Sequence, residues 1–181
     1  MLSLFAQEEP IVITNYVTDK YWDINGSRTS TIPPSGFTRS EIGFVQTKSD
    51  AMIAVEHSHD AILLTEYKFL RSFDTASHKD SAGSETIESM RFRINGFDAL
   101  LVKLKIFTND DAYYAWRLYI GDDNSSDILT GSYPAEKESQ LGNAIRTSLL
   151  SAFFDKDKRI LPVGADPTII STSSCKCNEK K

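Results

Sequence analysis

The pattern of apolar and polar residues along the chain is dominated by a period of two, which is typical of strands with two different faces. Residues 99–107 are the clearest example. One face of that strand is expected to carry Leu100, Val102, Leu104 and Ile106. The opposite face combines two apolar residues with two lysines, namely Leu101, Phe107, Lys103 and Lys105. The pattern therefore predicts a sheet that is buried on one face and partly wet on the other.

Turn signals divide the chain into further strands. The dipeptides Asn25-Gly26 and Asn95-Gly96 each supply the two positive φ values of a type I′ turn, so each predicts a tight hairpin. Pro33-Pro34 ends regular pairing after the first hairpin, because proline cannot donate to a strand ladder. The predicted strands are residues 11–18, 21–24, 27–32, 42–48, 51–57, 87–94, 99–107, 114–120 and 127–133.

Two segments change to a helical period. Residues 60–73 place Leu63, Tyr67 and Leu70 on one face, widened by Ile62, with Ser58 or Asp60 as the N-cap. Residues 138–154 place four apolar residues three or four apart, namely Leu141, Ile145, Leu149 and Ala152. The polar segment 74–84 follows the first predicted helix and precedes the predicted strand 87–94, and it is predicted to be an exposed loop. Hairpins interrupted by two helices predict an α+β fold, a mainly antiparallel sheet flanked by helices, and disfavour a doubly wound parallel sheet.

Length and composition set the domain organisation. The chain has 181 residues, 40% of them hydrophobic, which is enough for one sizeable core. We expect one α+β domain over residues 8–160 and an irregular tail over residues 161–181, where Cys175 and Cys177 are too close in sequence to form a core disulfide. Residues 1–7 resemble the end of a signal peptide, which predicts an exported, periplasmic or secreted protein; the alternative is a cytoplasmic protein with a frayed N-terminus.

The charge pattern limits the partners. The formal net charge is -5, and no run of Lys or Arg exceeds two residues, so the chain lacks the basic field that attracts a phosphate backbone. Nucleic acid is therefore not an expected partner. No apolar stretch is long enough to cross a bilayer, so no membrane span is expected.

Three segments resemble PsbP-like domains. They are the strand and Pro-rich turn of residues 21–37, the hairpin residues Ile94-Asn95-Gly96, and the strand, Tyr-Pro break and helix of residues 128–154. The resemblance implies an α/β/α sandwich on an antiparallel sheet, the fold that PsbP shares with the Ran-binding Mog protein. It also implies an accessory or binding role, because known members are mostly of that kind, and it carries over no catalytic residue.

Two groups of residues are candidates for a site. His57 and His59 would project to one side of a continuing strand and could share a metal, but the sequence offers no further ligand with a recognised spacing. Asp110, Asp111 and Tyr113 place acidic and aromatic side chains together, as in surfaces that bind basic or sugar-like partners. We therefore predict Asp110, Asp111, Tyr113, His57 and His59 as partner-binding residues.

Other chemistry is not indicated. Residues 122–127 offer oxygen ligands, but position six is Asp127 and position twelve is Tyr133 where an EF-hand needs Gly and Glu, so a solvated turn is expected. No nucleophile elbow or phosphate loop is present, and no metal site or cofactor is predicted. The sequence favours a non-enzymatic accessory protein with an unidentified protein partner. The alternatives are a small-ligand carrier with a pocket between sheet and helix, and a metal-dependent hydrolase built on the two histidines.

Overall fold

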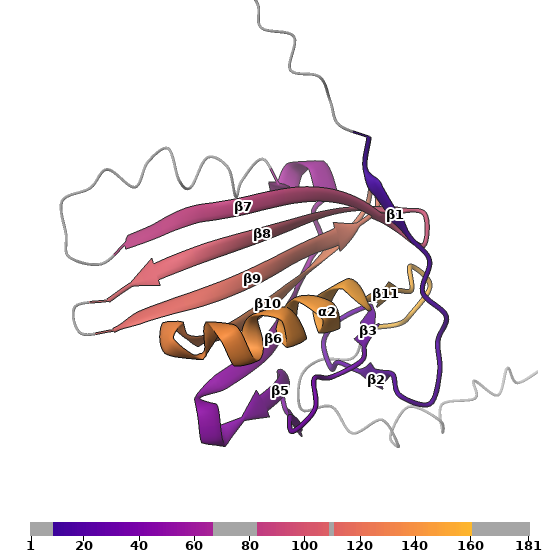
Figure 1. Ribbon diagram of the computed structural model, residues 1–181. Coiled ribbons are helices and arrows are strands. Elements are labelled where there is room, and N and C mark those ends of the chain that lie inside the picture. Colours follow the sequence, from indigo (N-terminus) through magenta and orange to yellow (C-terminus); the bar gives the residue numbers. More distant parts are fainter. Residues whose placement is uncertain (1–8, 67–82, 109–110, 161–181) are drawn as a thin grey trace, which may run out of the picture.

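The main sheet is the framework of the protein. The computed structural model describes residues 9–66, 83–108 and 111–160. Eight strands form this sheet in the order β1-β7-β8-β9-β10-β6-β5-β4 (Figure 1). Their bounds are β1 Ile11–Ile13, β4 Thr38–Ser40, β5 Gly43–Gln46, β6 Ala51–Ser58, β7 Gly83–Ile94, β8 Phe97–Phe107, β9 Ala112–Gly121 and β10 Ser126–Pro134. All neighbours are antiparallel except β1 and β7, which confirms the mainly antiparallel sheet.

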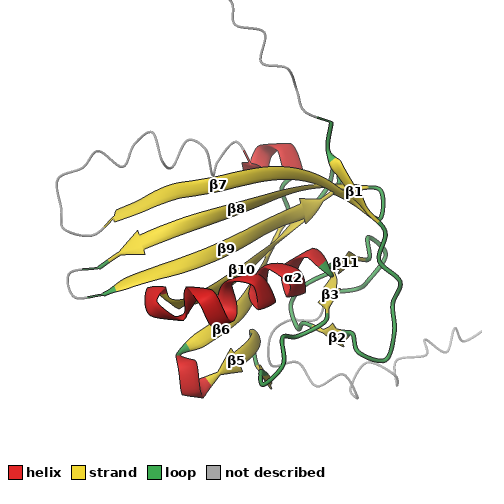
Figure 2. Cartoon of the chain, viewed as in Figure 1, coloured by secondary structure: helices red, strands yellow, loops and turns green. Residues whose placement is uncertain are grey.

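A small sheet and several helical segments complete the fold. Strands β2 Trp22–Asp23, β3 Thr29–Thr31 and β11 Phe153–Phe154 form the small sheet, in the order β11-β3-β2. The helical segments are η1 Thr47–Ser49, η2 Ala135–Lys137, η3 Glu138–Gly142 and α2 Asn143–Leu150, with a further helical turn over residues 62–66. Figure 2 shows α2 crossing one face of the main sheet and the 62–66 turn behind β7. Helical structure on both faces confirms the α/β/α arrangement.

The period-two rows explain why both faces of the sheet are buried at its centre. Leu101, Leu118 and Leu129 lie on the α2 face and pack with Ile145 and Leu149 of the helix in one core. The predicted row Leu100, Val102 and Leu104 lies on the other face and packs with Ile62 in a second core. The predicted division of residues 99–107 between two faces is therefore confirmed, but the face with Lys103 is more buried than predicted. On the α2 face, solvent exposure increases toward the end of β8, where the Phe107 side chain is exposed.

One predicted hairpin turn is confirmed and the other is wrong. Asn95 and Gly96 have φ values of 50° and 86°, as a type I′ turn between β7 and β8 requires. At the first dipeptide only Gly26 has a positive φ. Trp22 and Asp23 pair with Thr31 and Ser30, so residues 24–28 form a wider loop before β3. Contacts with the distant residue Asp127, described below, hold this loop open.

The first predicted helix has a different buried face from the expected one. Ile62 is buried, but Leu63 and Leu64 are 64% and 44% exposed. Thr65 and Glu66 face inward instead, and the Glu66 carboxylate accepts a 2.9 Å hydrogen bond from Arg91 of β7. The predicted residues Tyr67 and Leu70, and residues 74–82 of the predicted loop, lie outside the described residues. Residues 83–84 of that loop belong to strand β7.

The second predicted helix has the expected face but a different end. Leu141, Ile145, Leu149 and Ala152 are all buried, as predicted. The α-helix ends at Leu150 instead of residue 154, because Asn15 Nδ2 donates to the carbonyls of Leu150 and Ala152 and the chain then pairs with β3.

The observed bounds of two other strands differ from the predicted ones. The first predicted strand, residues 11–18, is a strand only over β1, Ile11–Ile13. The strand predicted over residues 42–48 extends only over β5, Gly43–Gln46. Strand β4 was missed in the sequence. It is three residues long, and its Thr-Arg-Ser sequence carries no apolar alternation.

Candidate functional site

An acidic hollow lies at one end of the main sheet. Asp111, Ala112 and Tyr113 from the start of β9 line it together with Pro134, Ala135 and Glu136 from the end of β10 and η2, and Asp50 from the turn before β6. The hollow has a volume of about 530 Å³. The strand pairing explains its position, because Tyr113 lies opposite Pro134 in the β9–β10 ladder.

The charges of the acidic hollow are available to a partner. Asp50, Asp111 and Glu136 are exposed, and within the described parts of the chain none of them forms an ion pair. Tyr113 is half-buried, so its ring supplies an apolar wall beside the carboxylates. Such a surface can hold an ammonium or guanidinium group by charge while the ring packs against its aliphatic stem.

The structure brings together two of the predicted partner-binding residues and adds others. Asp111 and Tyr113 both line the acidic hollow, whereas Asp110 lies outside the described residues. Asp50 and Glu136 were not predicted. No local signal marks them, because they reach the hollow only through the order of strands β6, β10 and β9 in the sheet.

The other two predicted residues, His57 and His59, lie at the opposite end of the sheet. His57 pairs with Asp127 at the start of β10, seven residues from Pro134 at the hollow. This separation is roughly 23 Å at the rise of an extended strand. The five predicted residues therefore do not form one surface. The two histidine rings are in contact, edge to face, with centroids 4.9 Å apart.

His57 is part of a buried hydrogen-bond network. Its Nδ1 lies 2.7 Å from Asp127 Oδ1, and the exposed fractions of the two side chains are 7% and 0%. The other carboxylate oxygen of Asp127 accepts hydrogen bonds from Arg28 N at 2.8 Å and from Thr29 Oγ1 at 2.7 Å. The network joins β6 and β10 of the main sheet to the 24–28 loop and β3.

This network corrects the expectation for residues 122–127. The turn itself is confirmed, because Asp122 Oδ1 accepts from the N–H groups of Asn124 and Ser125. Asp127 is not solvated, however, because it lies after the turn and inside the protein. The described residues contain no group of three or more His, Cys, Asp or Glu side chains that could hold a metal ion. The geometry thus assigns Asp127 a structural role.

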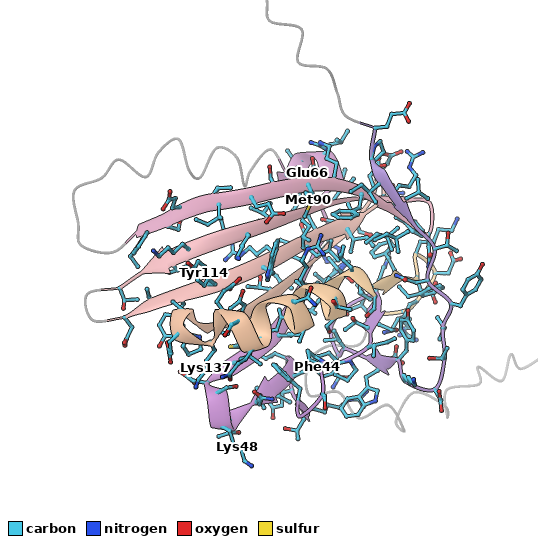
Figure 3. The ribbon with its side chains drawn as sticks, in the orientation of Figure 1. Phe44, Lys48, Glu66, Met90, Tyr114 and Lys137 are labelled. Atoms are coloured by element: carbon cyan, nitrogen blue, oxygen red, sulfur yellow. The ribbon has the colours of Figure 1, made fainter. Side chains whose placement is uncertain are left out.

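A second polar network, which the sequence did not indicate, lies between the sheet and the start of the last helix. Lys103 Nζ donates to Glu138 Oε1 at 2.6 Å, and Tyr133 Oη donates to Glu138 Oε2 at 2.7 Å. The Lys103 ammonium also lies 4.9 Å and 5.3 Å from the ring centres of Tyr114 and Trp116. Figure 3 shows Tyr114 and Lys137 at the end of the sheet where the helical segments begin. These contacts fix η3 to β8, β9 and β10, directly after the η2 wall of the acidic hollow.

Tyr133 gives this network a measurable pH dependence. Burial and the neighbouring Glu138 carboxylate hold the pKa of the Tyr133 phenol well above its usual range. Unfolded tyrosine loses its proton above a pH of about 10, and the native phenol does not, so stability falls as pH rises past that value. We expect Tyr133→Phe to cost about 1 kcal/mol at neutral pH and to reduce the alkaline loss.

Urea denaturation at neutral and alkaline pH tests this expectation. Tyr21 and Tyr119 also have pKa values raised by burial, so part of the alkaline loss should remain in the variant. An alkaline loss as steep in Tyr133→Phe as in the native protein would contradict the assignment.

Comparison with known proteins identifies the fold. No family model matches the chain, and no curated protein matches it. Among solved structures it is similar to cyanobacterial PsbP (CyanoP) from Synechocystis sp. PCC 6803, with 12% identity, a TM-score of 0.56 and coverage of 75% of this chain and 91% of that one. The protein therefore has a PsbP-like fold.

Two other solved structures match at lower TM-scores. A protein of unknown function from Pseudomonas aeruginosa has 14% identity and a TM-score of 0.49, over 76% of this chain and 88% of that one. LpqN of Mycobacterium tuberculosis, which is involved in cell envelope biogenesis, has 10% identity and a TM-score of 0.47, over 68% and 81%. The part of the chain that the structure describes contains no helix long and apolar enough to span a membrane.

Proposed function

We propose that this protein is a non-enzymatic accessory protein that binds a protein partner, and that a basic segment of the partner docks in the acidic hollow. The observation that carries the proposal is the set of three exposed carboxylates, Asp50, Asp111 and Glu136, around the half-buried Tyr113. The PsbP-like fold supports it, because PsbP-like proteins are mostly accessory proteins.

The position of the acidic hollow also supports the proposal. Asp111 and Glu136 stand at the paired ends of β9 and β10, and the Lys103–Glu138–Tyr133 network anchors the helical segment that follows. The acidic groups are thus held on a fixed framework, which lowers the ordering cost when a partner binds. Charge complementarity then sets which partners associate and how fast.

Neutralising the acidic hollow should weaken the binding of cations. We expect the triple variant Asp50→Asn/Asp111→Asn/Glu136→Gln to bind a labelled Lys/Arg-rich peptide about ten-fold more weakly than the native protein, since each exposed charge contributes a fraction of a kcal/mol. Fluorescence anisotropy at several salt concentrations measures this, and native binding should weaken as salt rises.

A matched control separates the acidic hollow from net charge. The variant Asp19→Asn/Glu41→Gln/Asp123→Asn removes three exposed carboxylates elsewhere and should bind like the native protein. An equal loss of peptide affinity in both triple variants would reject the acidic hollow as the docking site. A photo-crosslinking residue at position 113 should then label one protein in cells, and the same residue at position 19 should not. Labelling from both positions alike would overturn the proposal.

The alternative functions receive less support. A carrier would need space between sheet and helix, but Leu129 of β10 and Ile145 of α2 pack in one core, and a Cβ built on Gly131 of β10 would approach Ile145 Cγ2 to 2.2 Å. A metal-dependent hydrolase built on His57 and His59 would need a further ligand, and the described residues hold no group of three or more His, Cys, Asp or Glu side chains that could bind a metal ion. Export remains a prediction, since residues 1–7 lie outside the described residues. Cell fractionation that finds the full-length protein only in the cytosol would reject it.

A further inference from the structure

The two Asn-Gly dipeptides occupy opposite chemical environments. Asn95 is held on both sides of its amide, because its Oδ1 accepts from Asn15 N at 2.6 Å and its Nδ2 donates to Asn15 O at 3.2 Å. Asn25 is exposed, and among the described residues its side chain has no hydrogen-bond partner. The N–H of Gly26 likewise makes no hydrogen bond to the described chain. One asparagine amide is locked, and the other is free beside a free backbone nitrogen.

We propose that Asn25 is a site of spontaneous deamidation and that the native fold protects Asn95 from the same reaction. The Gly26 nitrogen attacks Asn25 Cγ, a C–N bond forms, and ammonia leaves with the proton that the nitrogen loses. Water then opens the resulting succinimide at either carbonyl, which gives aspartate or isoaspartate. Only water is consumed. Gly26 favours the attack because it has no Cβ to obstruct the approach.

The fold gives this modification a structural consequence. Isoaspartate adds a methylene to the main chain between Ile24 and Ser27, and Ser27 Oγ bonds the carbonyl of Ile24 at 3.1 Å. The next residue, Arg28, donates its backbone N–H to the buried Asp127. Lengthening the main chain here shifts Arg28 N relative to the Asp127 carboxylate. Isoaspartate at position 25 therefore loosens the small sheet from the main sheet.

The experiment compares the two asparagines in one native sample. Full-length protein is held at mildly alkaline pH, sampled over time and digested, and the two peptides are followed by mass spectrometry and by isoaspartate methyltransferase labelling. Releasing Asn95 requires breaking its two amide hydrogen bonds, so Asn25 should convert about ten- to thirty-fold faster. In denaturant the two rates should become similar, because both dipeptides then have the same local sequence chemistry.

Two further results decide the proposal. The variant Asn25→Gln should stay unmodified at position 25 and should keep its stability to urea during ageing, while the native protein loses stability as isoaspartate accumulates. Equal rates at the two asparagines in native protein, or faster conversion of Asn95, would overturn the proposal. So would a native ratio that is unchanged in denaturant, because the fold would then contribute nothing.

Discussion

Asp127→Ala should lower the free energy of unfolding by about 3–5 kcal/mol, because it removes the common acceptor of a buried network. The Asp127 side chain has an exposed fraction of 0%; its Oδ1 lies 2.7 Å from His57 Nδ1, and its Oδ2 accepts from Arg28 N and Thr29 Oγ1. After the substitution, the buried Thr29 hydroxyl and the partly buried Arg28 N–H are left without their acceptor, and a buried orphan group costs about 1–3 kcal/mol. Urea denaturation followed by circular dichroism measures the change.

Two controls distinguish the Asp127 network from general effects of the substitution. Asp123→Ala removes an exposed carboxylate from the neighbouring turn and should change stability by no more than about 0.5 kcal/mol. Asp127→Asn keeps the shape of the side chain but replaces one acceptor oxygen by a donor, so it should cost less than the alanine variant but remain clearly destabilising. A loss below about 1 kcal/mol in Asp127→Ala would show that the network is not a main support of the fold.

The first hairpin shows where prediction from the sequence fails. The dipeptide rule is local, and it succeeds at Asn95-Gly96 because long strands on both sides favour a two-residue turn. At Asn25-Gly26 the flanking strands are short, and Asp127 binds Arg28 N and Thr29 Oγ1 from about a hundred residues away. The residues around Asn25-Gly26 do not indicate that Asp127 will bind there. The loop 24–28 could therefore not be predicted from its own residues.

The helices show the same limit. The predicted face of the second helix is confirmed, because Leu141, Ile145 and Leu149 lie on one stripe and are buried. Around residues 62–66 the apolar residues are more numerous than one stripe can hold. The structure buries Ile62 but leaves Leu63 exposed, and the charged residue Glu66 faces inward with Arg91 as its partner. Apolar spacing alone could not select that face.

The candidate site was predictable only in part. Asp111 and Tyr113 are close in sequence, and a turn before a strand keeps such residues together. Asp50 and Glu136 join them through strand order, which a single sequence does not encode in any short motif. His57 and Asp111, grouped as one set of partner-binding residues, lie at opposite ends of the sheet for the same reason. Residues that are close in sequence could be grouped from the sequence. Which of these groups share a surface depends on the order of the strands in the sheet.

Gly131→Ala should destabilise the protein by about 2–3 kcal/mol, because helix α2 packs directly on β10 at this position. A Cβ on Gly131 would lie 2.2 Å from Ile145 Cγ2 and 3.5 Å from Ile53 Cγ1. Ile145 has an exposed fraction of 0%, so it cannot move aside into solvent. Gly83→Ala is the matched control: nothing lies within 4 Å of the added Cβ, and we expect a change of no more than about 0.5 kcal/mol.

A double-mutant cycle tests whether the contact with Ile145 causes the loss. Ile145→Ala alone should cost about 2–5 kcal/mol, because it leaves a cavity in the core. In that background the methyl group added at position 131 occupies part of the cavity, so adding Gly131→Ala should cost less than about 0.5 kcal/mol or restore stability. Urea denaturation of the four proteins gives the coupling energy. Additive losses would instead place the strain in the β10 backbone, because an additive cycle means that Gly131 and Ile145 do not interact.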